Sequence, residues 1–390
     1  MSKSVKIFLL VLCVLLGSFL HVRSQDEEPK LLMSGYLKDM VITDFSLSDS
    51  VLWTNLIHNR LNFKWYPNDK FSAFVEFRTQ WYTGDYVKII PGFENQIGAA
   101  EDFFDLSWTV VSNEYNVLHA MVDRVYLEYQ SNDWNARLGR QRINWGVSMI
   151  WNPNDLFNAY SYVDFDYEER PGSDALRIQK FTGFASSVEV AANLADNLGS
   201  WVGAVKWAIN KGGYDFQVIG GFAKKDVAFG GAWAGNIKRG GLKGEFTYFI
   251  PVAGNTKNNA FLGTFSYDYS FKNNLYFNVS YLYNSDGALD LGSGGFIDFY
   301  FGELTARDLS PYMHSAFLLS TYPFHPLITG ALAIMSFPGN KSLFINPTVT
   351  ISLLSNLDLS ITGQIFYGEN MAGDFKSLSR VLYTRLKWSF

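Results

Sequence analysis

Apolar and polar residues alternate without a break at the end of the chain. Leu382, Leu386 and Phe390 belong to one set, while Arg385 and Lys387 belong to the other. A period of two sends successive side chains to opposite faces of a β-strand. We expect the polar set to face water and the apolar set to face a hydrophobic phase.

The same alternation recurs upstream in segments of about ten residues, the length that a tilted strand needs to cross a bilayer. The clearest segments are 60–65, 73–78 and 124–129, and a first strand is predicted at 34–41. Further strands are predicted to begin near Asn135, Ser173, Ala185, Ser200, Tyr214, Asp226, Gly241, Asn259, Asn274, Met313, Ile328, Ser342 and Leu357. The pattern predicts about 18 strands, with 16 and 14 as alternatives.

The connections between these segments differ in length in a regular way. Tight segments rich in turn residues lie at 67–69, 131–133, 211–213, 238–241, 272–274 and 355–358, on alternate connections. The long segments 84–118, 146–172 and 285–312 fall on the other set. Membrane barrels have short periplasmic turns and longer outer loops. We therefore expect an even number of strands and both termini in the periplasm.

Composition separates a membrane barrel from a soluble one. Aromatic residues make up 17% of the chain, while the mean hydropathy is −0.02. A membrane barrel needs two girdles of aromatic residues where acyl chains meet head groups. A soluble β-sandwich or propeller would also have short alternating strands, but it would not place Leu, Trp and Phe outside. The predicted fold class is an all-β, transmembrane antiparallel β-barrel.

The first 24 residues differ from the rest. Lys3 and Lys6 precede an apolar run at 7–20, and Val22 and Ser24 are small enough for the positions before a cleavage site. This pattern predicts a signal peptide at 1–24, cleaved near Ser24 during export through the periplasm to the outer membrane. An uncleaved helical anchor is the alternative, but the run is too short to span about 30 Å. Residues 25–390 are predicted to form a single barrel domain.

Charge and cysteine content exclude several classes of function. Without Lys3, Lys6 and Arg23, the chain has 29 basic and 37 acidic residues, so it lacks the basic surface that nucleic-acid binding needs. The only cysteine, Cys13, lies within the signal peptide, which excludes disulfides and cysteine nucleophiles from the mature chain.

Catalytic motifs are absent from the sequence. None of His58, His119, His314 and His325 lies in a nucleophile or metal motif. We predict that the protein is not an enzyme and needs no cofactor.

Residues 137–172 form the most distinctive stretch. It contains Gly139-Arg140-Gln141, then Trp145-Gly146, and ends in Arg170-Pro171-Gly172. This resembles a porin-type family of bacterial outer-membrane barrels, in which a strand carrying Gly-Arg-Gln and then Trp-Gly enters a long loop that ends in Arg-Pro-Gly. The resemblance covers about a tenth of the chain, and it implies a solute channel. The terminal Phe390 resembles the signature that the barrel-insertion machinery reads.

The long loop that follows Trp145 is rich in aromatic residues. It could fold inward and narrow the lumen, with Arg170 facing the barrel wall or a solute, or it could pack on itself outside as a lid. Its acidic residues Asp164, Asp166, Glu168 and Glu169 either form a Ca²⁺ site or, as we favour, an acidic tip beside lipopolysaccharide.

The strand phases point several basic side chains into the lumen. These are Arg60, Lys64, Arg78, Arg124, Arg142, Arg177, Arg385 and Lys387. Guanidinium groups in a narrow aqueous pore favour anions, although the same arginines could pair with Glu76 and Glu128 merely to fill the interior. Arg137 and Arg140 cannot both face inward on a regular strand, so a bulge at Gly139 or a strand end is needed.

These features predict a passive diffusion channel for small hydrophilic solutes that is anion-favouring or weakly substrate-selective. The candidate selectivity residues are Arg124, Arg140, Arg142, Arg170, Arg177, Trp151 and Tyr160. One alternative is a channel for a neutral ligand such as a sugar, in which Trp151, Tyr160 and Tyr162 would stack on the solute. A barrel without a pore, with a structural or adhesive role, is another. The expected partners are outer-membrane lipid and lipopolysaccharide, and both a monomer and a homotrimer fit the sequence.

Overall fold

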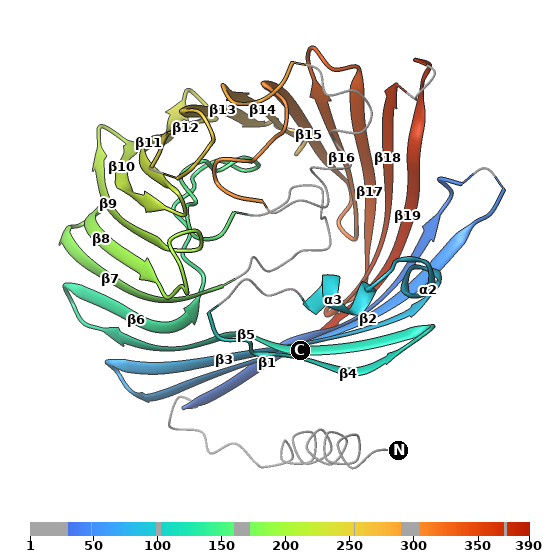
Figure 1. Cartoon of the computed structure of the whole chain (residues 1–390), viewed down its shortest axis with the longest axis horizontal. Helices are drawn as coiled ribbons and strands as arrows, with labels where there is room; N and C mark the ends of the chain where they lie inside the picture. Colours follow the sequence, from blue (N-terminus) through green and yellow to red (C-terminus); the bar gives the residue numbers. More distant parts are fainter. Residues whose placement is uncertain are drawn as a thin grey trace.

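The computed structural model describes residues 30–47, 49–98, 103–159, 172–252, 254–289, 304–369 and 373–390. Figure 1 shows its strands arranged around a ring. The elements are β1 (Leu31–Asp44), β2 (Leu52–Asn68), β3 (Phe71–Gly84), α2 (Asp85–Ile89), α3 (Phe93–Gly98), β4 (Ser107–Asn113), β5 (Asn116–Gln130), β6 (Trp134–Gln141), β7 (Ser173–Gly183), β8 (Ser186–Asn193), β9 (Val202–Lys211), β10 (Tyr214–Ala223), β11 (Asp226–Ile237), β12 (Gly240–Pro251), β13 (Ala260–Ser270), β14 (Tyr276–Asn284), β15 (His314–His325), β16 (Ile328–Phe337), β17 (Ser342–Leu354), β18 (Leu357–Glu369) and β19 (Phe375–Ser389).

The ring closes through its first and last strands. β1 pairs with β19 in antiparallel register, with Tyr36 opposite Ser389. The sheet has 19 strands, but β3 pairs directly with β5, and β4 pairs with β5 alone among the described residues. Leaving out β4 gives a closed ring of 18 antiparallel strands, which confirms the predicted count and its even parity.

The two ends of the ring differ in the length of their connections. The turns at 68–71, 211–214 and 237–240 lie at the same end as both termini of the barrel. The long segments 84–116, 141–173 and 284–314 lie at the opposite end. We call these the turn end and the loop end. The loop end also has one tight connection, at 223–226, where Lys224 has a φ of 56°.

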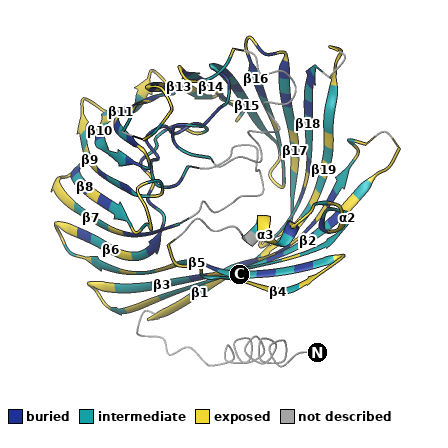
Figure 2. Cartoon of the chain, viewed as in Figure 1, coloured by how far each residue is buried: buried dark blue, intermediate teal, exposed yellow. Residues whose placement is uncertain are grey.

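Outward and inward residues alternate along the strands (Figure 2). On β19, Leu386 and Trp388 are 40% and 45% exposed on the outer face, whereas Arg385 faces inward and donates to Ser360 Oγ at 3.4 Å. The outer surface is therefore apolar and the interior polar, as the period of two predicts.

The helices are short and lie near the loop end. Val87 of α2 and Phe93 of α3 pack against Val117 of β5. No helix in the described ranges is long and apolar enough to cross a membrane.

Gly139 determines how β6 ends. Its φ is 121°, and a Cβ atom there would lie 2.3 Å from the carbonyl oxygen of Val125. The register of β6 shows no shift, so the expected bulge is absent and the positive φ near the end of the strand takes its place. A bulge lies instead in β5, where Asp123 is inserted opposite β3.

We predict that Gly139→Ala destabilises the barrel, because alanine adds both left-handed strain and a backbone clash. The expected loss is about 1–3 kcal/mol of unfolding free energy, measured by urea unfolding in detergent. Gly220→Ala is the control, since a Cβ there would make an ordinary 3.6 Å contact with Phe229. Equal stability of the two variants would contradict the prediction.

Candidate functional site

The described part of the segment after β6, residues 142–159, lies inside the ring. Trp145, Trp151 and Leu156 are all 5% exposed or less, and they belong to one hydrophobic cluster with inward residues of the wall. Figure 1 shows the segment within the ring of strands. Of the two arrangements that the sequence leaves open, the described part adopts the inward one.

The wall beneath this segment has small apolar side chains. Ala191, Ala204, Ala228 and Ala260 face inward from β8, β9, β11 and β13 and are buried in the same cluster. Small side chains leave room for a packed loop, and Trp151 fills this space until its ring meets Phe317 edge-on. One side of the barrel wall is thus built as a seat for the loop.

Glu245 holds this loop through backbone groups. Its carboxylate is 1% exposed and accepts hydrogen bonds from the amides of Val147 (2.8 Å), Ser148 (3.2 Å) and Asn154 (2.8 Å). Trp145 Nε1 also donates to Glu189 at 2.6 Å. Because buried polar groups need hydrogen-bond partners, Glu245 and Glu189 each gain donors from the loop and fix its course.

The predicted selectivity residues divide into three groups. Arg140, Arg177 and Trp151 pair or pack at the wall, Arg142 and Arg124 have other surroundings, and Tyr160 and Arg170 lie outside the described residues. Arg140 and Arg177 form ion pairs at the wall, with Asp174 at 2.9 Å and Glu189 at 2.7 Å respectively. Arg140 is 1% exposed and Trp151 is 0% exposed, so both occupy packing positions rather than the solute-facing positions expected of them. Asp174 lies opposite Arg140 on the neighbouring strand β7, after a long connection, and Phe317, which Trp151 contacts, lies on β15. The local sequence pattern reveals neither contact.

Arg142 and Arg124 have different surroundings. Arg142 lies just beyond β6. Its Nη2 donates to the side-chain oxygen of Asn144 at 3.0 Å, and the side-chain nitrogen of Asn144 donates to Asp155 Oδ2 at 3.0 Å. Arg124 lies on the inner face of β5, where it pairs with Glu76 at 3.5 Å. Tyr160, Tyr162 and Arg170 lie outside the described residues.

The strands β1, β2, β3, β5 and β19 lie across the ring from the inward segment (Figure 1), and their inward positions carry a set of basic side chains. We call it the basic wall: Lys38, Arg60, Lys64, Arg78, Arg124, Arg385 and Lys387. Within the described ranges, Glu76 and Asp123 form ion pairs with Arg60, Arg78 and Arg124 of this wall.

The carboxylates in the basic wall are shared. Glu76 pairs with Arg60 and Arg124, while Asp123 pairs with Arg60 and, at 3.1 Å, with Arg78. Three guanidinium groups therefore share two carboxylates, which leaves positive charge on this side of the interior. Neither Lys38 nor Asp123 was predicted to face the lumen. Lys38 lies on the first strand, β1, and Asp123 faces inward only because of the bulge in β5.

Aromatic rings support the lysines of the basic wall. Lys387 and Lys38 lie over the ring of Tyr36, at 4.5 and 5.7 Å from its centre, and Lys64 lies 5.9 Å from the centre of the Phe74 ring. Cation–π contacts orient an ammonium group without neutralising it.

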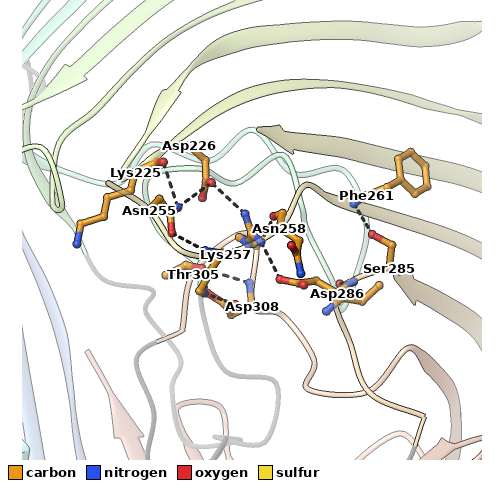
Figure 3. A network of polar contacts seen from close by, with 12 residues as sticks. Lys225, Asp226, Asn255, Lys257, Asn258, Phe261, Ser285, Asp286, Thr305 and Asp308 are labelled. Carbon is orange, nitrogen blue, oxygen red and sulfur yellow. Dashed lines mark hydrogen bonds and ion pairs between the residues drawn. The ribbon is translucent and has the colours of Figure 1, made fainter. Parts of the chain in front are cut away.

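A polar network joins three connections at the loop end. Arg307 pairs with Asp226 at 2.9 Å and with Asp286 at 2.7 Å, and Asn255 Nδ2 donates to Asp226 at 3.1 Å (Figure 3). A cavity of about 470 Å³ lies beside it. No sequence motif marked this network, because its members are single residues from separate loops.

No group of three or more His, Cys, Asp or Glu side chains in the described part of the chain could hold a metal ion. The acidic residues Asp164, Asp166, Glu168 and Glu169, considered for Ca²⁺, lie outside that part.

No protein-family model matches the chain, and no curated protein matches it either. Among solved structures it is similar to OccAB4 of Acinetobacter baumannii, with 11% identity, a TM-score of 0.58 and coverage of 94% of this chain and 100% of the other. OccK5 (OpdH) of Pseudomonas aeruginosa has 8% identity, a TM-score of 0.57 and coverage of 93% and 98%. OccK11 (OpdR) of the same organism has 8% identity, a TM-score of 0.56 and coverage of 95% and 100%. The similarity shows the fold, a closed antiparallel β-barrel.

We predict that Glu245→Gln loosens the inward loop, because a side-chain amide would present its own N–H groups to backbone donors. Leaving a buried donor without its acceptor costs about 1–3 kcal/mol, so the amides of Val147, Ser148 and Asn154 should exchange with deuterium about ten- to a hundredfold faster. Asp358→Asn is the control, since Asp358 lies on β18 and accepts from Ser352 Oγ. Unchanged exchange in Glu245→Gln would show that apolar packing alone holds the loop.

Proposed function

We propose that this protein is an outer-membrane channel through which small hydrophilic solutes diffuse passively, with a preference for anions. The observation that carries the proposal is the basic wall, which places seven cationic side chains on the inner faces of β1, β2, β3, β5 and β19. Lys38 and Arg60 are buried within it, and Arg60, Arg78 and Arg124 share Glu76 and Asp123. Opposite it, the inward loop narrows the interior. A solute that passes between the two meets fixed positive charge at close range.

The chemistry of the basic wall favours carboxylates and similar anions. Guanidinium groups bind such anions through paired, parallel hydrogen bonds, and the lysines add point charges. Passive diffusion needs no cofactor, because binding has only to be favourable enough for entry and weak enough for exit.

The proposed location is the outer membrane. The apolar outer surface suits lipid, and residues 1–24 have the pattern of a signal peptide. Phe390 also takes part in ring closure, since its amide and carbonyl bond to the carbonyl and amide of Gly35 at 3.0 and 2.9 Å. We propose that the insertion machinery recognises the same terminal strand.

The channel for a neutral ligand has less support. Trp151, which would have to stack on a sugar, is 0% exposed within the loop–wall cluster. Its ring cannot reach a solute in this conformation.

Single-channel recording of the refolded protein in a planar bilayer, under a KCl gradient, tests this proposal. We expect discrete conductance with a reversal potential that favours chloride. Absence of conductance from correctly folded protein would reject the channel, and a reversal potential that favours potassium would reject the role of the basic wall.

We predict that the double variant Arg385→Gln, Lys387→Gln lowers the preference for chloride. A unit charge about 4 Å from an ion contributes about 1 kcal/mol in water, so we expect the permeability ratio to fall by about fivefold or more. Lys88→Gln is the control, since Lys88 lies in α2 and is 47% exposed beside Glu114. An equal ratio in all three proteins would contradict the prediction.

A further inference from the structure

The cavity beside the Arg307 network has an apolar floor and a polar rim. On the floor, Leu156 of the inward loop, Phe249 of β12 and Ala306 are each 5% exposed or less and belong to the cluster that seats the loop. At the rim, Lys257 pairs with Asp308, and their side chains are 47% and 37% exposed, so the rim reaches water. The volume of about 470 Å³ lies within the usual range of small-molecule sites, about 300–1,000 Å³.

The lining of this cavity contains more cations than carboxylates. Its charged residues are Lys224, Lys225, Lys257, Arg307, Asp226 and Asp308. Both carboxylates are already engaged, because Asp226 pairs with Arg307 and Asp308 pairs with Lys257, each at 2.9 Å. Lys225 forms no ion pair with any residue that the structure describes, and in Figure 3 its ammonium group points away from Asp226. Its positive charge is therefore available to a ligand.

Hydrogen bonds hold the wall of the cavity in place. Asn255 Nδ2 donates to the Lys225 carbonyl oxygen at 3.2 Å and to Asp226 Oδ1 at 3.1 Å (Figure 3). Arg307 then joins Asp226 to Asp286 of the next connection. A wall that is fixed before binding lowers the cost of ordering it around a ligand. The same contacts occupy the guanidinium group of Arg307, so the attraction of an anion falls to the lysines.

The type of cation favours a phosphate group over a carboxylate. An arginine fork matches a planar carboxylate through two parallel hydrogen bonds, whereas a lysine ammonium acts as a point charge. Attraction to a point charge increases with the charge of the ligand. A phosphate monoester carries about −1.5 to −2 at pH 7, more than a carboxylate, which carries a single charge. The apolar floor adds a surface that an organic ester can cover and a bare phosphate ion cannot.

We propose that this cavity binds a phosphate monoester with a small apolar body, taken from the solution at the loop end. The phosphate lies at the lysine rim, and the apolar body lies on Leu156 and Phe249. The site is separate from the basic wall, whose strands lie across the ring from the inward segment (Figure 1). Binding requires no conduction, so the inference can hold or fail independently of the proposed channel.

Isothermal titration calorimetry of the protein in phosphatidylcholine nanodiscs tests the proposal, with phenyl phosphate as the probe. Inorganic phosphate lacks the apolar body, benzyl alcohol lacks the charge, and benzoate has a planar anionic group with a single charge. We expect phenyl phosphate to bind about tenfold more tightly than each of these three compounds. Equal affinity for benzoate would overturn the choice of phosphate, and equal affinity for inorganic phosphate would overturn the role of the apolar floor.

Substitution of the unpaired lysine locates the site. Lys225→Gln should weaken the binding of phenyl phosphate by about fivefold or more, the contribution of a unit charge about 4 Å from an ion in water. Lys341→Gln is the matched control, since Lys341 also lies at the loop end, 75% exposed beside Glu369, and it should keep full affinity. The basic-wall variant Arg385→Gln, Lys387→Gln should keep it too. Absence of binding, unchanged affinity in Lys225→Gln, or an equal loss in either of the other variants would each overturn the proposal.

Discussion

Every backbone N–H and C=O group at the depth of the hydrocarbon must be paired within the protein, and the structure depends on this constraint. An open sheet would leave two unpaired edges, so the pairing of β1 with β19 is what allows the other strands to face lipid. The bonds between Gly35 and Phe390 carry this closure to the last residue of the chain. The even number of strands and the common end of both termini follow from it, because an antiparallel ring can close on itself only with an even number of strands.

Closure also determines where polar side chains can go. Because lipid surrounds the ring, a period-two strand must send its charges inward, where they either pair or face water. Both outcomes occur in the interior of this barrel. Alanines on β8 to β13 make a seat for an aromatic loop that Glu245 holds through three backbone amides. Across the ring, the described inner faces of the strands that form the basic wall carry more cations than carboxylates.

The sequence was sufficient for the strands because alternation is a local property, and the phase of β19 could be assigned from Leu382 to Phe390 alone. It was insufficient where partners are distant in the chain. Arg140 was predicted as a selectivity residue, but Asp174, 34 positions away, pairs with it and buries it. The extra strand β4 lies within a segment predicted as a loop. The network around Arg307 left no local signal, since three separate connections supply it.

The rule that polar side chains face the lumen also applies to the polar side chains that lie on the outer face. If polar side chains face inward because lipid excludes them, then a polar side chain that faces outward at mid-depth requires a partner other than lipid. Asp39 and Asn59 meet that condition within the chain, since Asn55 Nδ2 donates to Asp39 Oδ1 at 2.6 Å and Asn59 Nδ2 donates to the Tyr36 carbonyl oxygen at 3.2 Å. The inward charges of the basic wall and the pairing of these outward polar residues thus follow from one physical cause that acts on two faces of the same strands. On β2, Arg60 faces the interior while its neighbour Asn59 faces outward.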